Sequence, residues 1–228
     1  SEIPIETPIR PKLDVSAFQR VLVAGFIAGG TEDVDGNLET TRLLRSQLRT
    51  KSEMRVIDTD VLPLMDVAVE SRGTNGAPAD GGTEPGAIRE DADLEPYEHL
   101  FADVEYWKRI GEEYQQPLIV TGTVMFAPQA RSGIVQRDQE VYDSFGRRRV
   151  VPVRTYMERK GFVLKPRFVF IDGRTGTVLH SENFREEVLY NANQTSPALS
   201  SYFELMDRLI PSFLSTLSSQ SIRGSRVL

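Results

Sequence analysis

Apolar runs and helical stripes alternate along the first half of the chain. Residues 20–26 (RVLVAGF) are rich in β-branched and apolar side chains, as expected for a strand buried on both faces. Leucines at helical spacing follow between positions 38 and 48, and the acidic turn over 32–37 suits a helix N-terminus. Residues 54–58 (MRVID) fit a second strand. A crossover this short predicts parallel pairing, so we expect a right-handed β-α-β unit.

The middle of the chain predicts a long helix followed by three strands. Pro96 suits a first helical position, and large apolar residues recur at helical spacing over 97–114. Strand patterns follow at 118–126 and 163–172. An Asp-Gly-Arg-Thr-Gly turn then leads into a further strand at 177–184, so the last two strands should form a hairpin.

A last helix closes the pattern. We expect it to begin at Ser200 or Ser201, because Ser201 and Glu204 have the spacing of a capping box. Apolar residues over 202–217 form its buried stripe.

Together these elements predict an α/β fold with a mixed sheet in two or three layers. It combines a β-α-β start, a C-terminal hairpin and helix, and an inserted β-arm over 128–162. Residues 66–96 are expected to be a mobile loop, because glycine and proline concentrate from Gly73 to Gly86 among few large apolar residues. The predicted organisation is an extended tether over 1–18, one α/β domain over 19–220 and a tail over 221–228.

Composition excludes several classes of function. The 228 residues carry a formal net charge of −6, which argues against a general nucleic-acid binder. The sequence has no cysteine, which removes disulfides, thiol chemistry and cysteine-based metal sites. The longest uncharged apolar run, 21–30, is about half the length of a membrane-spanning helix.

The two histidines offer little for catalysis. Ser181 follows His180 directly, and neighbours on a strand point to opposite faces, so a catalytic triad is not expected. His99 and Asp103 lie one helical turn apart, where a surface ion pair is favoured over a shared metal. We therefore predict a protein that is not an enzyme and that needs no cofactor.

Glycines 25, 29 and 30 between a strand and a helix invite comparison with a phosphate-binding loop. Their spacing fits neither dinucleotide nor P-loop motifs, and the acidic residues over 32–39 would repel an anion. Asp33, Asp35, Asn37 and Glu39 are oxygen donors at alternating positions, as in a calcium loop, but the full loop pattern is missing. A strand-helix turn and helix capping are the favoured interpretations.

The arm carries the strongest local charge anomaly of this acidic chain. Three consecutive arginines stand among exposed apolar positions, and a hairpin that projects from a domain has little core to bury such residues. They indicate either contact with an acidic or phosphate-bearing partner or a solvated hairpin tip. The candidate contact residues are Tyr142, Phe145, Arg147, Arg148, Arg149, Arg154 and Tyr156.

Four sequence words, in this order, resemble a known group of proteins. They are RVLVAGF at 20–26, RVIDTDVL at 55–62, PLIVTGTVMF at 117–126 and FVFIDGRTGTVLHSENF at 168–184. Over roughly residues 20 to 217 the chain resembles the fold shared by the curli secretion channel, the amino-terminal domain of the Tol translocation protein B and related outer-membrane lipoproteins.

The chain departs from that group in two respects. The curli channel carries two insertions that span the membrane, whereas this chain has one, at 128–162, and 185–199 is too short for the other. Charges over 136–140 and 147–149 fall on both faces of the arm, so we expect no membrane-spanning hairpin. The lipid-bearing cysteine of those lipoproteins is absent, although the proline-spaced start at Ser1 resembles the segment that comes after that cysteine.

The resemblance implies an exported, non-enzymatic assembly or adaptor module of the cell envelope. It would be periplasmic or associated with the outer membrane, would act through protein partners or as a homo-oligomer, and would meet the membrane only through a lost lipid anchor. The alternative is a small-ligand or nucleotide-binding domain with its site near Gly29, Asp58 and Asp60, beyond the ends of the strands. A hydrolase using Asp58 and Asp60 is a more distant alternative.

Overall fold

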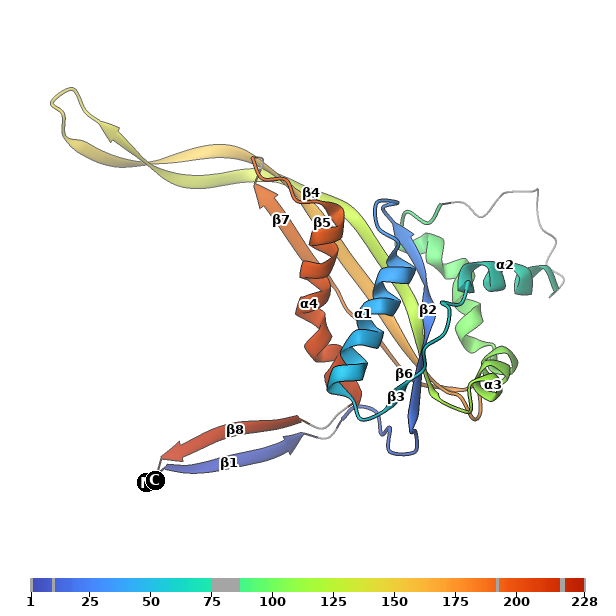
Figure 1. Cartoon of the computed structure of the whole chain (residues 1–228). Helices are drawn as coiled ribbons and strands as arrows, with labels where there is room; N and C mark the ends of the chain where they lie inside the picture. The colour runs from blue at the N-terminus through green and yellow to red at the C-terminus, as the bar shows by residue number, and fades with distance from the viewer. Residues whose placement is uncertain (1, 10, 75–86, 192, 218–219, 228) are drawn as a thin grey trace.

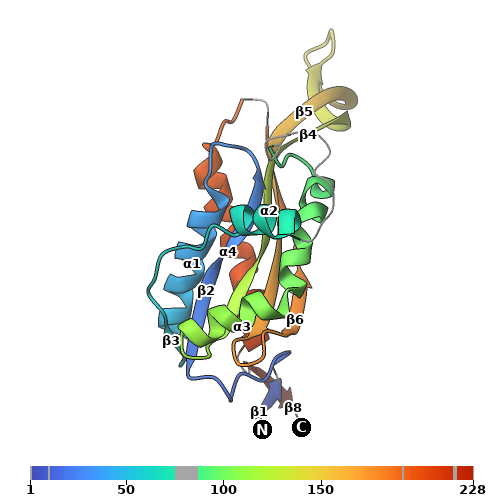
Figure 2. The same cartoon turned by 90° about the vertical axis from the view of Figure 1, so that its right-hand side faces the viewer.

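A mixed β-sheet lies between two layers of helices in the computed structural model (Figures 1 and 2). The structure describes residues 2–9, 11–74, 87–191, 193–217 and 220–227. The sheet order is β3-β2-β4-β5-β6, and β7 pairs with β5 as well. The strands are β2 (Arg20–Gly30), β3 (Arg55–Val56), β4 (Leu118–Tyr142), β5 (Arg148–Asp172), β6 (Val178–Asn183) and β7 (Glu186–Asn191).

Each face of the sheet is covered by its own helices. Figure 1 shows α1 (Gly36–Lys51) and α4 (Ala198–Leu217) on one side, and α2 (Leu64–Thr74), the 3-10 helix η1 (Asp91–Ala102) and α3 (Val104–Glu113) on the other. Strand β4 supplies Val120 and Val124 to one hydrophobic core and Ile119 and Met125 to the second. A continuous apolar run is therefore needed, because both faces are buried. The predicted α/β fold with a mixed sheet is confirmed, in three layers.

The β-α-β start and the hairpin are confirmed as well. Strand β2 pairs in parallel with β3 and with β4, and Asp35 caps α1 by accepting a hydrogen bond from the backbone N of Leu38 at 3.0 Å. Strands β5 and β6 are antiparallel. In the turn between them, the Arg174 guanidinium is bonded to the buried Asp172 carboxylate at 2.9 and 3.0 Å.

The predicted loop over 66–96 is wrong at both ends. Helix α2 extends to Thr74 and η1 begins at Asp91, because Ala68 and Leu94 are buried in the second core and hold these turns against the sheet. Residues 75–86, which include most of the glycine-rich stretch, lie outside the described residues.

The single long helix predicted over 97–114 is also corrected. Asp103 ends η1 and caps α3, accepting a hydrogen bond from the backbone N of Tyr106 at 3.0 Å. The indole Nε1 of Trp107 donates to the carbonyl of Leu100 at 2.8 Å across the break. Apolar side chains on both sides of the break therefore reach the same core.

Helix α4 begins earlier than the predicted capping box. It starts at Ala198, and Ser201 is fully buried with its hydroxyl 3.1 Å from that of Tyr190. Ser201 therefore joins α4 to β7, a strand that the sequence did not predict.

The two ends of the chain meet. Strand β1 (Glu2–Ile9) pairs antiparallel with β8 (Gln220–Val227), and this ribbon extends from the body of the domain (Figure 1). Leu13 and Phe18 are buried in the first core, so the packed part of the chain begins ahead of residue 19.

Candidate contact surface on the β-arm

The most prominent feature of the molecule is the hairpin that strands β4 and β5 form beyond the sheet (Figure 1). We call residues 128–162 the arm. Its strands pair without interruption from Pro128 opposite Phe162 to Tyr142 opposite Arg148. The inserted β-arm predicted from the sequence is therefore confirmed.

The turn at the tip of the arm is specified locally. The Asp143 carboxylate accepts hydrogen bonds from the backbone N of Phe145 and of Arg147, each at 2.9 Å. The bond from the Arg147 backbone is the main cause that holds the pKa of Asp143 below its ordinary value. Gly146 has a φ of +73°, a conformation that favours glycine. These contacts fix the turn and hence the register of the strands.

The arm has no core of its own. None of the residues from 128 to 160, all of which the structure describes, is buried. Ile134 is 71% exposed and Phe145 is 80% exposed. An isolated two-stranded hairpin is at best marginally stable, and clustered apolar residues on a surface mark a contact site.

The predicted arginine cluster is largely paired within the arm. Arg147 binds Asp143 at 3.0 Å, Arg148 binds Glu140 at 3.0 Å, and Arg149 lies 3.9 Å from Asp143. These exposed pairs contribute little stability. They do offset much of the tip's positive charge, so a role in partner binding stays a prediction for these three arginines.

The other predicted contact residues lie on the strands of the arm. The structure brings Tyr142 opposite Arg148, and Tyr156 opposite Ile134. Arg154 stands opposite Gln136 and forms no ion pair with any residue that the structure describes. Phe145 lies in the turn, and the centre of its ring is 5.4 Å from the Cζ of Arg147.

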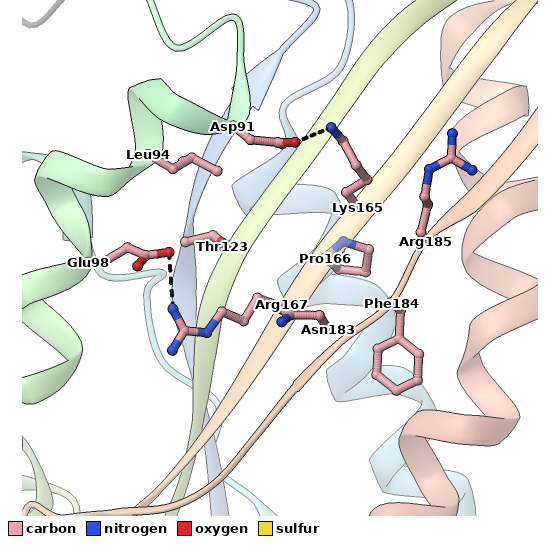
Figure 3. Close-up of a pocket in the computed structure, with 10 residues that line it drawn as sticks. All are labelled: Asp91, Leu94, Glu98, Thr123, Lys165, Pro166, Arg167, Asn183, Phe184 and Arg185. Atoms are coloured by element: carbon pink, nitrogen blue, oxygen red, sulfur yellow. Dashed lines mark hydrogen bonds and ion pairs between the residues drawn. The ribbon is translucent and has the colours of Figure 1, made fainter.

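A hollow of about 320 Å³ lies between η1 and the sheet, near the base of the arm (Figure 3). Lys165 pairs with Asp91, and Arg167 pairs with Glu98 at 3.0 Å. The Nε of Arg167 also donates to Ser181 at 3.0 Å. Two of the basic side chains of the hollow therefore clamp η1 to β5. The sequence did not indicate this clamp, because its residues come from segments far apart in the chain.

The glycines of the alternative ligand site are explained by close packing against neighbouring segments of the chain. A Cβ added to Gly29 would lie 2.2 Å from the Ile88 side chain, and one at Gly30 would lie 1.9 Å from the carbonyl oxygen of Phe126. Asp58 lines a different hollow from these glycines and pairs with Arg49 at 3.5 Å. The structure does not bring Gly29 and Asp58 together in one pocket.

Each histidine has one of the partners of a Ser-His-acid triad, and neither has both. The Nε2 of His180 lies 3.4 Å from the Glu182 carboxylate, while the neighbouring Ser181 hydroxyl accepts a hydrogen bond from Arg167. The predicted ion pair of His99 with Asp103 is wrong, since Asp103 caps α3. His99 instead lies with Nε2 at 2.8 Å from the Ser71 hydroxyl and Nδ1 at 2.9 Å from the Pro96 carbonyl oxygen. This pair joins α2 to η1, and its third member is a backbone carbonyl in place of a carboxylate.

Metal-binding groups and membrane-spanning helices are absent from the described part of the chain. No group of three or more acidic or histidine side chains there could hold a metal ion. Within the same residues, no helix is both long enough and apolar enough to cross a bilayer.

Comparison with known proteins gives distant structural similarity only. No family model and no curated protein matches the chain. Lipoprotein GNA1162 from Neisseria meningitidis is 12% identical, with 88% of this chain and 99% of that chain covered and a TM-score of 0.37. A PelC dodecamer from Paraburkholderia phytofirmans, a point variant of that protein, is 14% identical, with 96% and 100% covered and a TM-score of 0.42. A neuraminyllactose-binding hemagglutinin homolog from Helicobacter pylori is 9% identical, with 92% and 88% covered and a TM-score of 0.39.

Proposed function

We propose that this protein is a non-enzymatic assembly or adaptor module of the cell envelope that acts through protein-protein contacts, with the arm as its contact element. The observation that carries the proposal is the arm itself. It extends the sheet past every helix of the domain, buries none of its residues from 128 to 160, and exposes apolar side chains along both strands. A second surface would bury these side chains and hold the hairpin in one conformation.

The arrangement of polar side chains supports a role other than catalysis. Four ionisable groups of the hollow beside η1 form two ion pairs across it, Lys165 with Asp91 and Arg167 with Glu98. The histidine on η1 contacts a serine and a backbone carbonyl without a carboxylate. Such contacts hold α2 and η1 together, and a serine-histidine pair without a carboxylate lacks the third member of a catalytic triad.

The proposed location is the periplasm or the periplasmic side of the outer membrane. The four sequence words that resemble envelope lipoproteins support export. A homo-oligomer is the simplest assembly, because a projecting arm on each copy can reach the next copy.

Site-specific photo-crosslinking in the bacterial envelope tests this function. A photoreactive phenylalanine analogue replaces Phe145 at the tip of the arm, which is 80% exposed, and a matched control carries it in place of Leu199, which is 45% exposed on α4. We expect a crosslinked protein adduct from position 145 and none from position 199. Adducts from position 199 alone, or from neither position, would contradict a contact role for the arm.

A further inference from the structure

The register of the arm sorts its residues onto two faces. Residues directly opposite each other in an antiparallel pair point to the same side, and successive residues point to opposite sides. Arg137 lies opposite Val153, and Val141 lies opposite Arg149, so odd-numbered residues of both strands share one face. We call this the odd face (odd positions over 129–141 and 149–161) and the opposite side the even face.

The two faces differ in charge. The arm has eight basic and four acidic residues, a net charge of +4. The turn holds one of each sign, and the even face carries three basic and three acidic residues, which cancel. The odd face has four arginines and no acid. Its charged and large apolar residues are Arg131, Arg137, Arg149, Arg159, Val135, Val141, Val151, Val153 and Met157.

The positive charge of the odd face is only partly compensated. Arg131 pairs with Glu187 at 3.0 Å, and Arg149 stands 3.9 Å from Asp143. Arg137 and Arg159 form no ion pair with any described residue, and both side chains are exposed. The odd face therefore combines half-buried apolar side chains with two guanidinium groups that are free within the described residues, an arrangement that suits an acidic protein surface.

A complementary surface lies on the same chain. Residues 87–113, which include η1, α3 and the segment just ahead of η1, carry nine acidic and three basic residues, a net charge of −6. Glu95, Glu105, Glu112 and Glu113 are exposed there and form no ion pair within the described residues. Val104 is 39% exposed among them. We call this the acidic layer.

We propose that the odd face of the arm docks on the acidic layer of a second copy of this chain. The inference rests on the proposed function and names the partner surface of the arm. The arm projects away from α2, η1 and α3 of its own chain (Figure 1), so the two surfaces meet only between copies. Since the two surfaces differ, the contact is head-to-tail, and repeating it gives a closed ring or a filament.

Pairing of arms edge to edge fits the strands less well. Pro128 and Pro152 lack a backbone N–H, and charged side chains follow the open edges of both strands. Prolines and charges of this kind protect an edge strand against pairing with another chain. Contact through the odd face needs no backbone donor.

A pair of matched charge reversals tests the docking. The first variant carries Arg137→Glu and Arg159→Glu on the odd face, and the control carries Arg154→Glu and Lys160→Glu on the even face. Both change the net charge by the same amount. In sedimentation equilibrium we expect the odd-face variant to self-associate about tenfold or more weakly, while the even-face control stays within about threefold of the parent chain.

A charge exchange then identifies the partner surface. Glu105 and Glu112 are seven residues apart on α3 and so share a face, and the Glu105→Arg and Glu112→Arg chain should fail to self-associate. Mixed with the odd-face variant, this chain should form a complex, because the arm that now carries glutamates meets a layer that now carries arginines.

The remaining outcomes separate this inference from the proposed function. In one outcome, removal of residues 130–160 abolishes self-association while the odd-face variant and the Glu105→Arg and Glu112→Arg chain both self-associate like the parent chain. In that case the arm is a contact element, but the acidic layer is not its partner. If the odd-face variant loses binding to vesicles of anionic phospholipid and keeps its self-association, a membrane surface is the partner and the inference is overturned.

Discussion

A buried hydroxyl pair between α1 and α4 offers a sharp test of how the first helical layer is held. Thr40 and Tyr202 are both fully buried, and their hydroxyl oxygens are 2.5 Å apart. Burial raises the pKa of Tyr202, so its phenol stays protonated at neutral pH. Replacing either partner alone leaves the other hydroxyl buried without this bond.

The expected magnitudes follow from that geometry. Tyr202→Phe and Thr40→Val should each lower the free energy of unfolding by about 1–3 kcal/mol, the cost of an unsatisfied buried polar group. In a chain of this size each kcal/mol corresponds to a decrease of about 2–4 °C in Tm. The double variant replaces both partners by apolar groups of similar shape, so it should lose much less than the sum of the single variants.

Urea unfolding followed by circular dichroism measures the four members of this cycle. A coupling energy of about 1 kcal/mol or more is expected. Additive losses in the double variant, or a Tyr202→Phe variant as stable as the parent chain, would refute the reasoning.

Two further predictions concern the turn between β5 and β6. Gly176→Ala should destabilise the protein far more than Gly146→Ala in chemical denaturation. Both glycines have a positive φ, but only a Cβ at position 176 would clash, at 2.1 Å from the carbonyl oxygen of Val104. Equal losses of stability in the two variants would show that this contact is unimportant. Burial raises the pKa of Asp172, but hydrogen bonds from Arg174 outweigh it and hold that pKa below its ordinary value. The carboxylate therefore contributes stability that is present above its unfolded pKa of about 4 and is lost as pH falls through its folded pKa. In the Asp172→Asn variant, Tm should fall less between about pH 4 and pH 2 than it does in the parent chain. The same decrease of Tm with pH in both chains would exclude this contribution.

The pattern of apolar residues predicted the elements whose burial is continuous along the chain. Strands β2 and β4 were evident because both their faces are buried, and the start of α1 was evident from its acidic cap. The break at Asp103 was missed because Trp107 and Leu100 keep helical spacing across it while a side-chain cap starts a new helix.

Strand β7 was missed for a different reason. Val188 is its one buried residue, so its sequence carries little pattern. Its pairing comes from Arg159–Leu164 of β5, far from it in the chain. Pattern in a single segment cannot reveal a strand whose order is supplied by a distant partner.

The arm and its arginines were located from the sequence, but the sorting of charge onto one face was not. That sorting depends on the turn at residues 143–147, which places odd residues of β4 opposite odd residues of β5. A slip of the register by one residue would place Arg137 opposite Arg154 and mix the two sets. The candidate surface therefore required the register, which the hydrogen bonds to Asp143 set.

The central claim, that the arm is an intermolecular contact element, is tested most directly by the solution mass of the chain with and without residues 130–160. Because none of those residues is buried, the shortened chain should keep its fold and its Tm. Light scattering behind a sizing column should give a multi-subunit mass for the full chain and the mass of a monomer for the shortened one. The same multi-subunit mass for both chains would contradict the account.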